Sequence, residues 1–213
     1  YESLANNIIA IGGKRNSKPD ATGWIYEENK AVINYHTYED IKNMTVWKRN
    51  EGWYNAELIE KDPRTDLAVI RIDGAEFDEF ISVASENSEV GDEIYTIGFP
   101  AKNRYIAAEG IISSHNEAFS SVTGKPLPDA LMATTNQTYG SSGSPIMTTD
   151  GELTGMVSAG NEWTTYAISA EMINRVLPVI ASGDEYKHPV IGAEFRTVSR
   201  EVIEEYGLPV NHG

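Results

Sequence analysis

The chain is a succession of short runs of β-branched and aromatic residues, and this pattern restricts its fold more than any other feature. The runs are rich in Val, Ile, Thr, Tyr and Trp, and Gly, Asn and Asp interrupt them. Such spacing favours an all-β barrel or sandwich over alternating strands and helices. The clearest examples are TGWIYEENKAVINYH, MTVWKRNEGWYNAELIEKD, TDLAVIRID, DEIYTIGFP, RYIAAEGIISSH, SPIMTTDGELTGMVSAG and EWTTYAISA.

Two turns and one helix complete this outline. Hairpin turns are predicted at Glu27 to Lys30 and at Thr148 to Glu152, the second around an Asp-Gly pair that tight turns favour. In AEMINRVLPVIASG the apolar residues recur at helical spacing and Gly183 ends the run. We expect a closing helix that packs on the second half of the fold, with Pro178 tolerated near its end.

Composition excludes several classes of function. The 213 residues suffice for one compact unit or two small ones. With 17 basic and 32 acidic side chains the net charge is −15, which disfavours nucleic acid as a partner. The chain has no cysteine, so disulfides and thiolate metal sites are excluded. No Asp, Glu and His residues converge in the sequence pattern, and we expect neither a metal nor a cofactor.

The two ends of the chain suggest a fragment. No apolar run reaches about eighteen residues, so nothing in this sequence is expected to span a bilayer. The first residue is Tyr1 rather than methionine, and we expect an excised or processed chain, with any signal peptide or membrane anchor upstream of it. After the predicted helix, a strand VIGAEFR and an amphipathic piece SREVIEEYG with a glycine stop predict the opening of another module.

Ser142, in the glycine-rich stretch YGSSGSP, is the candidate nucleophile. A serine hydroxyl needs an imidazole to take its proton and a carboxylate to orient that imidazole. Of the four histidines, His188 and His212 lie in the trailing module, and His115 lies in SSHNEAFSSVTGKPLPD, which predicts a solvated loop. His36 follows the apolar strand AVINY, whose end can hold a side chain rigidly at a cleft. We therefore predict His36 as the base.

For the carboxylate the choice is between two aspartates. Asp66 directly precedes the apolar run LAVIRI and should be drawn towards a buried strand start. Asp62 is the alternative, although the Pro-Arg pair after it predicts a turn there. The chain order His36, Asp66, Ser142 is one of the orders that serine triads adopt. The structural alternatives are a loop serine, a half-buried histidine bonded to backbone groups, and an aspartate that caps a turn.

The glycines around Ser142 suggest an oxyanion hole. Backbone N–H groups aimed at a developing oxyanion are worth several kcal/mol in a transition state. A tight turn through Gly140, Ser141 and Ser142 would direct the amides of Gly140 and Ser142 to one point. Glycine enters strained backbone regions at little steric cost, and Gly143 would let the chain leave without blocking the substrate.

Four blocks of this sequence together resemble a known family. TGWI…AVINYH, DPRTDLAVIRI, VGDEIYTIGFP…AAEGIISS and YGSSGSPIMTTDGELTGMVSA are similar to successive signatures of the HtrA (Deg) serine proteases of the chymotrypsin-like superfamily. They span most of Thr22 to Leu177 in the family's order. The resemblance implies two perpendicular six-stranded β-barrels with the active site between them, His36 and Asp66 coming from the first barrel and Ser142 from the second.

The resemblance also implies a domain division and an activity. The protease domain is expected over residues 1–183, with the first barrel at about 1–82 and the second at about 83–183, and HPVIGAEFRTVSREVIEEYGLPVNHG within 184–213 resembles a linker and the start of a PDZ domain. The implied activity is ATP-independent, metal-free endopeptidase action on unfolded or misfolded proteins through an acyl-enzyme. The family usually works outside the cytoplasm, in the periplasm or cell envelope, and often as trimers.

Three positions depart from the family's usual pattern. Ser141 stands where the family usually has Asn and digestive relatives have Asp, so activation by a newly cleaved N-terminus is not expected. Ser144 replaces the second glycine of GNSGGP. Glutamyl endopeptidases share a serine there, but GMVSAGN offers no histidine of the kind with which they recognise glutamate. Tyr139 stands where the family usually has proline.

The substrate pocket is inferred from the same resemblance. Its expected walls are the loop before the nucleophile and the strand GMVSAGN, all small or uncharged, which predicts a small or medium apolar side chain next to the cut. The residues concerned are Thr138, Tyr139, Val157, Ser158 and Ala159.

Two other classes of function compete with an endopeptidase. One is a catalytically idle, protease-like binding module whose PDZ-like segment recruits chain termini by β-augmentation. The other is an esterase of the nucleophile-elbow type, which requires helical crossovers and a late histidine that this sequence does not show.

Overall fold

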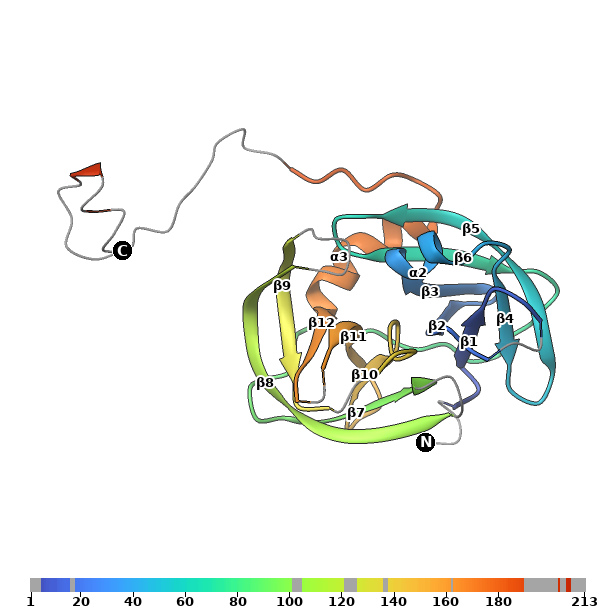
Figure 1. Ribbon diagram of the computed structural model, residues 1–213, viewed down its shortest axis with the longest axis horizontal. Helices are drawn as coiled ribbons and strands as arrows, with labels where there is room; N and C mark the ends of the chain where they lie inside the picture. Colours follow the sequence, from blue (N-terminus) through green and yellow to red (C-terminus); the bar gives the residue numbers. More distant parts are fainter. Residues whose placement is uncertain are drawn as a thin grey trace.

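The strands form two closed antiparallel barrels of six strands each (Figure 1). This arrangement confirms the predicted all-β, chymotrypsin-like fold. The computed structural model describes residues 5–15, 18–100, 105–120, 126–135, 138–161 and 163–189, together with positions 203, 206 and 207.

The strands of the first barrel are buried on both faces, which is why their apolar residues form continuous runs. Successive side chains of a strand point to opposite faces, so in β1 Ile9 and Ile11 fill the barrel interior while Ile8 and Ala10 join a second core outside it. The strands close in the order β1-β2-β3-β6-β5-β4. They are β1 (Ile8–Gly12), β2 (Ala21–Glu27), β3 (Lys30–Asn34), β4 (Thr45–Lys48), β5 (Gly52–Asp62) and β6 (Leu67–Ile72).

The second barrel closes in the order β10-β11-β12-β9-β8-β7 around its own apolar interior. Both predicted hairpin turns are present: Glu27 pairs with Lys30, and the Thr148 amide donates to the Glu152 carbonyl at 2.8 Å. The strands are β7 (Glu93–Gly98), β8 (Ile106–Ser120), β9 (Pro126–Ala133), β10 (Pro145–Thr148), β11 (Leu153–Gly160) and β12 (Thr165–Ser169).

The prediction of a solvated loop around His115 is wrong. This half-buried residue lies within β8, which continues to Ser120 and pairs with β9. The pairing shifts register at three places along the two strands. Backbone pairing does not require apolar side chains, so a polar stretch can extend a strand.

Helix α3 (Ala170–Ala181) confirms the predicted closing helix. Ser169 caps its N-terminus, because the Ser169 hydroxyl accepts a hydrogen bond from the amide of Met172 at 3.3 Å. Pro178 lies inside the helix, and Gly183 follows its end with φ +89°. The helix packs against β5 and β6 of the first barrel and β11 and β12 of the second.

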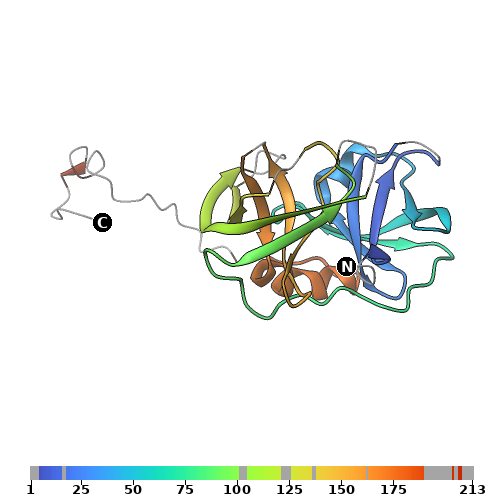
Figure 2. The ribbon, with the colours of Figure 1, turned by 90° about the horizontal axis from the view of Figure 1, so that it is seen from below.

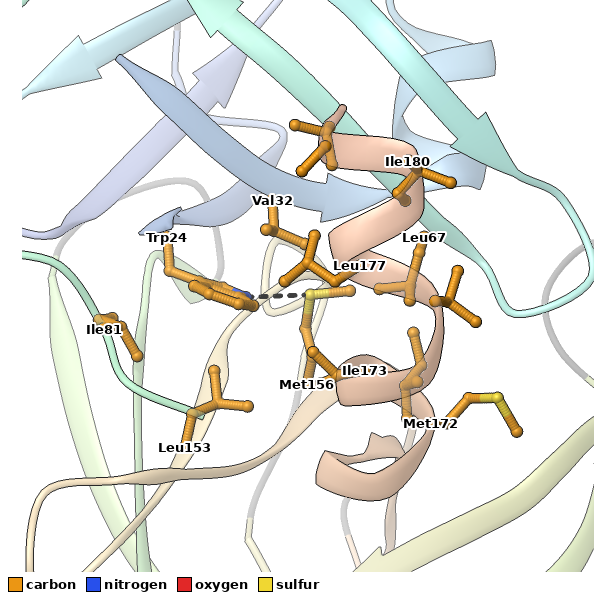
Figure 3. Packing of buried hydrophobic residues seen from close by; sticks show 14 of the residues in the cluster. Trp24, Val32, Leu67, Ile81, Leu153, Met156, Met172, Ile173, Leu177 and Ile180 are labelled. Carbon is orange, nitrogen blue, oxygen red and sulfur yellow. Dashed lines mark hydrogen bonds between the residues drawn. The ribbon is translucent and has the colours of Figure 1, made fainter. Parts of the chain in front are cut away.

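A core shared by both barrels and α3 fixes the seam between them. In Figure 3, side chains of the first barrel such as Trp24 meet Met156 of the second, and the indole N–H of Trp24 donates to the Met156 sulfur at 3.2 Å. Leu177 of α3 packs into the same cluster. Figure 2 shows the two barrels side by side with α3 along one side of both. The two barrels are therefore held as one body.

The trailing segment is described only in part. The strand predicted at 190–196 lies outside the described residues, as does His212. Of the predicted piece SREVIEEYG, the structure describes Ile203 and Tyr206 as helical and Gly207 with φ +59°. The PDZ assignment and the domain boundaries stay predictions. Across the described part of the chain, every helix is too short or too polar to traverse a bilayer.

Candidate active site

The structure brings the three predicted side chains into one hydrogen-bonded row. His36 Nδ1 lies 2.9 Å from Asp66 Oδ2, and His36 Nε2 lies 3.1 Å from Ser142 Oγ. His36 is the second residue of a short helix, α2 (Tyr35–Asp40), which begins where β3 ends. Asp66 lies in the turn between β5 and β6, and Ser142 precedes β10. The imidazole and the carboxylate thus come from the first barrel and the alcohol from the second.

Asp66 is completely buried and its carboxylate accepts four donors. Besides the His36 ring, the His36 amide donates to Oδ1 at 3.0 Å. The amide group of Asn34 donates to Oδ2 at 3.1 Å, and the hydroxyl of Ser158 donates to Oδ2 at 2.6 Å. Asp66 has φ +61°, a left-handed conformation that Asp tolerates better than most residues. A buried carboxylate with this many donors has a single orientation, and it fixes that of the imidazole.

Asn34 and Ser158 both bond to the Asp66 carboxylate, which the sequence did not predict: it gave Asn34 no role and placed Ser158 in the substrate pocket. Asn34 ends a buried strand and carries no motif, so its type alone gave no signal. Its Oδ1 is buried and has no hydrogen-bond partner among the described residues. The alternation of side chains along β11 would have separated Ser158 from Val157, because neighbouring residues of a strand face opposite ways.

Asp62, the alternative carboxylate, points elsewhere. It accepts hydrogen bonds from the Thr65 hydroxyl at 2.6 Å and the Arg64 amide at 3.1 Å. His188 Nε2 lies 2.7 Å from Asp62 Oδ2, so this trailing histidine contacts the first barrel. The partner of His36 in this structure is Asp66.

The chain before Ser142 forms a tight turn. The Ser141 amide donates to the Thr138 carbonyl at 3.0 Å, and Gly140, the third residue of the turn, has φ +96°. A positive φ at the third position is the requirement of a type II turn. No acceptor among the described residues takes the amides of Gly140 or Ser142. These two N–H groups, which the sequence singled out, remain available to a ligand.

Ser141 and Gly143 both support the loop that holds Ser142. The Ser141 amide is used within the turn, and its hydroxyl accepts from the Thr138 amide at 3.3 Å, so Ser141 supports the turn instead of offering a donor. Gly143 has φ +83°, and a Cβ there would lie 2.0 Å from the carbonyl oxygen of Thr22. Gly143 is therefore required by the contact between the barrels.

The residues predicted to line a substrate pocket do not all face one space. Val157 belongs to the interior of the second barrel, and the Ser158 hydroxyl is bonded to Asp66. Thr138 and Tyr139 are exposed and Ala159 is half-buried. Only these last three present surface near Ser142, and positions 136 and 137 lie outside the described residues.

The phenol beside His36 keeps its proton. The Tyr35 hydroxyl donates to the carboxylate of Glu39, and this bond, with burial and the charge of Glu39, raises the pKa of Tyr35 to about 12. The Lys61 ammonium lies 5.1 Å from the centre of the Tyr35 ring. Tyr35 is thus neutral over the pH range in which an unperturbed imidazole titrates.

This arrangement can deprotonate an alcohol and stabilise an oxyanion. The imidazole lies between a fixed acceptor and the hydroxyl, and the amides of Gly140 and Ser142 belong to the same loop as that hydroxyl. Within the described residues no three or more His, Asp and Glu side chains are grouped as metal ligands.

Comparisons with known proteins identify similar chains. A family model described as a trypsin-like peptidase domain matches residues 21–156. A probable periplasmic serine endoprotease DegP-like of Rhizobium meliloti (strain 1021) is 28% identical over 211 residues, covering 94% of this chain and 41% of that protein. A protein of the same name from Chlamydia muridarum is 26% identical over 199 residues, covering 90% of this chain and 40% of that protein. The chain thus spans about two fifths of the length of these relatives.

A solved structure shares the fold. The HtrA-type protease AlgW with decapeptide superimposes with a TM-score of 0.84 at 21% sequence identity, covering 100% of this chain and 75% of that one.

Proposed function

The chain belongs to the family of trypsin-like peptidase domains, and from this premise we propose that it is a serine endopeptidase that cleaves polypeptides through an acyl-enzyme. The observation that carries the proposal is the row Asp66–His36–Ser142, with distances of 2.9 Å and 3.1 Å. In this proposal Ser142 is the nucleophile, His36 the general base and Asp66 the group that orients the imidazole.

The two distances support the proposed proton path. His36 Nε2 takes the proton of the Ser142 hydroxyl while Oγ attacks the substrate carbonyl carbon, and the imidazolium then gives that proton to the departing amine. A water molecule then attacks the acyl carbon and gives a proton to His36. His36 passes this proton to Ser142 Oγ as the acid product leaves. Asp66 accepts the Nδ1–H throughout, so Nε2 is the nitrogen left free to act as base.

The amides of Gly140 and Ser142 are proposed to bind the oxyanion. Both belong to the turn that begins at Thr138, and neither has an acceptor among the described residues. Loss of one such donor typically lowers kcat by about 10²–10³-fold. Ser141, whose amide is used in the turn, takes no direct part.

The substrates are proposed to be unfolded or misfolded proteins, and the site of action to lie outside the cytoplasm. Support comes from the relatives, which are named periplasmic serine endoproteases. A small or medium apolar side chain next to the cut remains the proposed preference, and a peptide library cleaved only after Glu or Arg would contradict it. A trimer, a membrane anchor upstream, and a protease domain at 1–183 followed by the start of a PDZ domain are part of the same proposal.

The test is covalent labelling with a fluorophosphonate together with turnover of an unfolded protein. Wild-type protein is expected to form an adduct and to cleave, whereas Ser142→Ala should do neither. Ser182→Ala is the matched control, because this serine is exposed at the end of α3, away from the site. A folded wild type without a Ser142-dependent adduct would favour the idle binding module instead.

A further inference from the structure

We propose that Thr22, in β2 of the first barrel, is a positioning residue for the oxyanion hole of the second barrel. The inference rests on the proposed function and adds to it a residue outside the row of three. Its hydroxyl and its amide hold two carbonyls of the Ser142 loop, and through them the donor amides of Gly140 and Ser142.

Thr22 donates two hydrogen bonds to this loop, one from its amide and one from its hydroxyl. Thr22 is 0% exposed. Its amide donates to the Ser142 carbonyl at 2.9 Å, and its hydroxyl donates to the Gly140 carbonyl at 3.0 Å. The amide of Phe99 donates to the same hydroxyl at 3.0 Å. Because a hydroxyl has one hydrogen and Phe99 N–H can only donate, the Thr22 hydrogen goes to Gly140.

Thr22 bonds to the carbonyl of the peptide between the two donor peptides, and to the carbonyl of the peptide that follows them. The Gly140 amide belongs to the peptide 139–140 and the Ser142 amide to the peptide 141–142. Thr22 holds the carbonyl of the intervening peptide, whose N–H, on Ser141, donates to the Thr138 carbonyl at 3.0 Å. Since a peptide unit is planar, a unit fixed at its C=O and its N–H cannot rotate without breaking one of the two bonds.

The turn needs such an external hold. Gly140 has φ +96° and no Cβ, so its backbone has more conformational freedom than that of any other residue type would have at this position. The first barrel supplies the restraint at close range, because the Thr22 carbonyl oxygen lies only 2.0 Å from the position that a Cβ of Gly143 would take. An oxyanion hole built in one barrel is thus held in shape by a threonine of the other.

The discriminating variant is Thr22→Val, which keeps the shape of the side chain and removes the hydroxyl. It leaves the Gly140 carbonyl and the Phe99 amide without their partner. We expect kcat to fall about 10–100-fold, less than or equal to the loss of a whole oxyanion donor, with KM within about twofold because the hole acts on the transition state. Thr22→Ser, which restores the hydroxyl, should recover kcat to within about threefold.

The experiment measures kcat, KM and thermal unfolding for wild type, Ser142→Ala, Thr22→Val and Thr22→Ser on an unfolded protein substrate. A rise in KM with kcat unchanged, an unaffected Thr22→Val, or equal losses of kcat in Thr22→Val and Thr22→Ser would each overturn the inference while leaving the proposed function intact. If Thr22→Val does not fold, Thr22→Ala is measured against Thr22→Ser by the same criteria. A wild type without Ser142-dependent turnover would overturn the proposed function, and with it this inference.

Discussion

The buried carboxylate of Asp66 connects three elements at a single residue. Its donors come from α2 through His36, from β3 through Asn34 and from β11 through Ser158. The Ser158 contact crosses from the second barrel to the first. The orientation of the imidazole therefore depends on both barrels, even though His36 and Asp66 belong to the same one.

Two variants, Asp66→Asn and Asp62→Asn, test which of these buried aspartates, four positions apart, supports catalysis. In Asp66→Asn, either the amide N–H₂ or the amide oxygen faces His36, and neither accepts the Nδ1–H as well as a carboxylate does. The imidazole is then no longer held in the tautomer that leaves Nε2 free as the base, so kcat should fall by about 10⁴-fold. Asp62→Asn should keep kcat within about tenfold, because Asp62 contacts Thr65 and His188 instead. Steady-state kinetics on both variants, with circular dichroism as the check of folding, decides the assignment; equal losses would speak against it.

How far the sequence predicts the site depends on whether a residue carries its own signal. His36 and Ser142 could be chosen because the histidines are few and the glycines around the serine are dense. Thr22 and Asn34 could not, since their partners lie 118 and 32 residues away and neither type is distinctive. Val157 was assigned to a pocket although strand alternation places it in the barrel interior beside Ile146.

At the scale of elements, the strands and the closing helix were predicted correctly because their periodicities are strong. The six-residue helix α2 was not predicted, because the β-branched run before it reads as a strand that continues through Tyr35. The length of β8 was also missed, since its later residues are polar and carry no alternating apolar signal. Both errors have the same origin: tertiary pairing, not local preference, decides where these elements end.

The close approach of β7 to the start of β10 predicts a coupled pair of substitutions. A Cβ at Gly98 would lie 2.0 Å from the hydroxyl oxygen of the buried Ser144 and 2.8 Å from that of Thr22. Gly98→Ala should therefore lower the free energy of unfolding by about 1–3 kcal/mol through overpacking. In a Ser144→Gly background the same change should cost less, because the nearer clash is gone.

Denaturant unfolding of the four proteins in this cycle measures the coupling between positions 98 and 144. We expect an interaction free energy of about 1 kcal/mol, within the range of residues in contact. Strictly additive effects would show that the two strands adjust independently. Because Gly98→Ala also presses on the Thr22 hydroxyl, its kcat should fall as well.

At the scale of the whole molecule, the shared core makes the two barrels one unit. Leu177 is 1% exposed and packs with side chains of both barrels. Leu177→Ala should lower the free energy of unfolding by about 2–5 kcal/mol, the usual cost of a leucine cavity. Backbone circular dichroism and turnover should be lost at the same denaturant concentration, because the core that Leu177 belongs to contains side chains of both barrels and couples their unfolding.

The control for this prediction lies on the opposite face of α3. Arg175 is exposed and bonds to Glu171 at 2.6 Å, so Arg175→Ala should change the free energy of unfolding by no more than about 0.5 kcal/mol. Two separate unfolding transitions in Leu177→Ala, one for each barrel, would contradict a common core.

Because His36 and Ser142 belong to different barrels, they are synthesised well apart in time. Translation delivers the imidazole first and the alcohol 106 residues later, and α3, which completes the packing between the halves, emerges after both. The nascent chain therefore holds the imidazole and the carboxylate of the row before the hydroxyl that completes it has been synthesised.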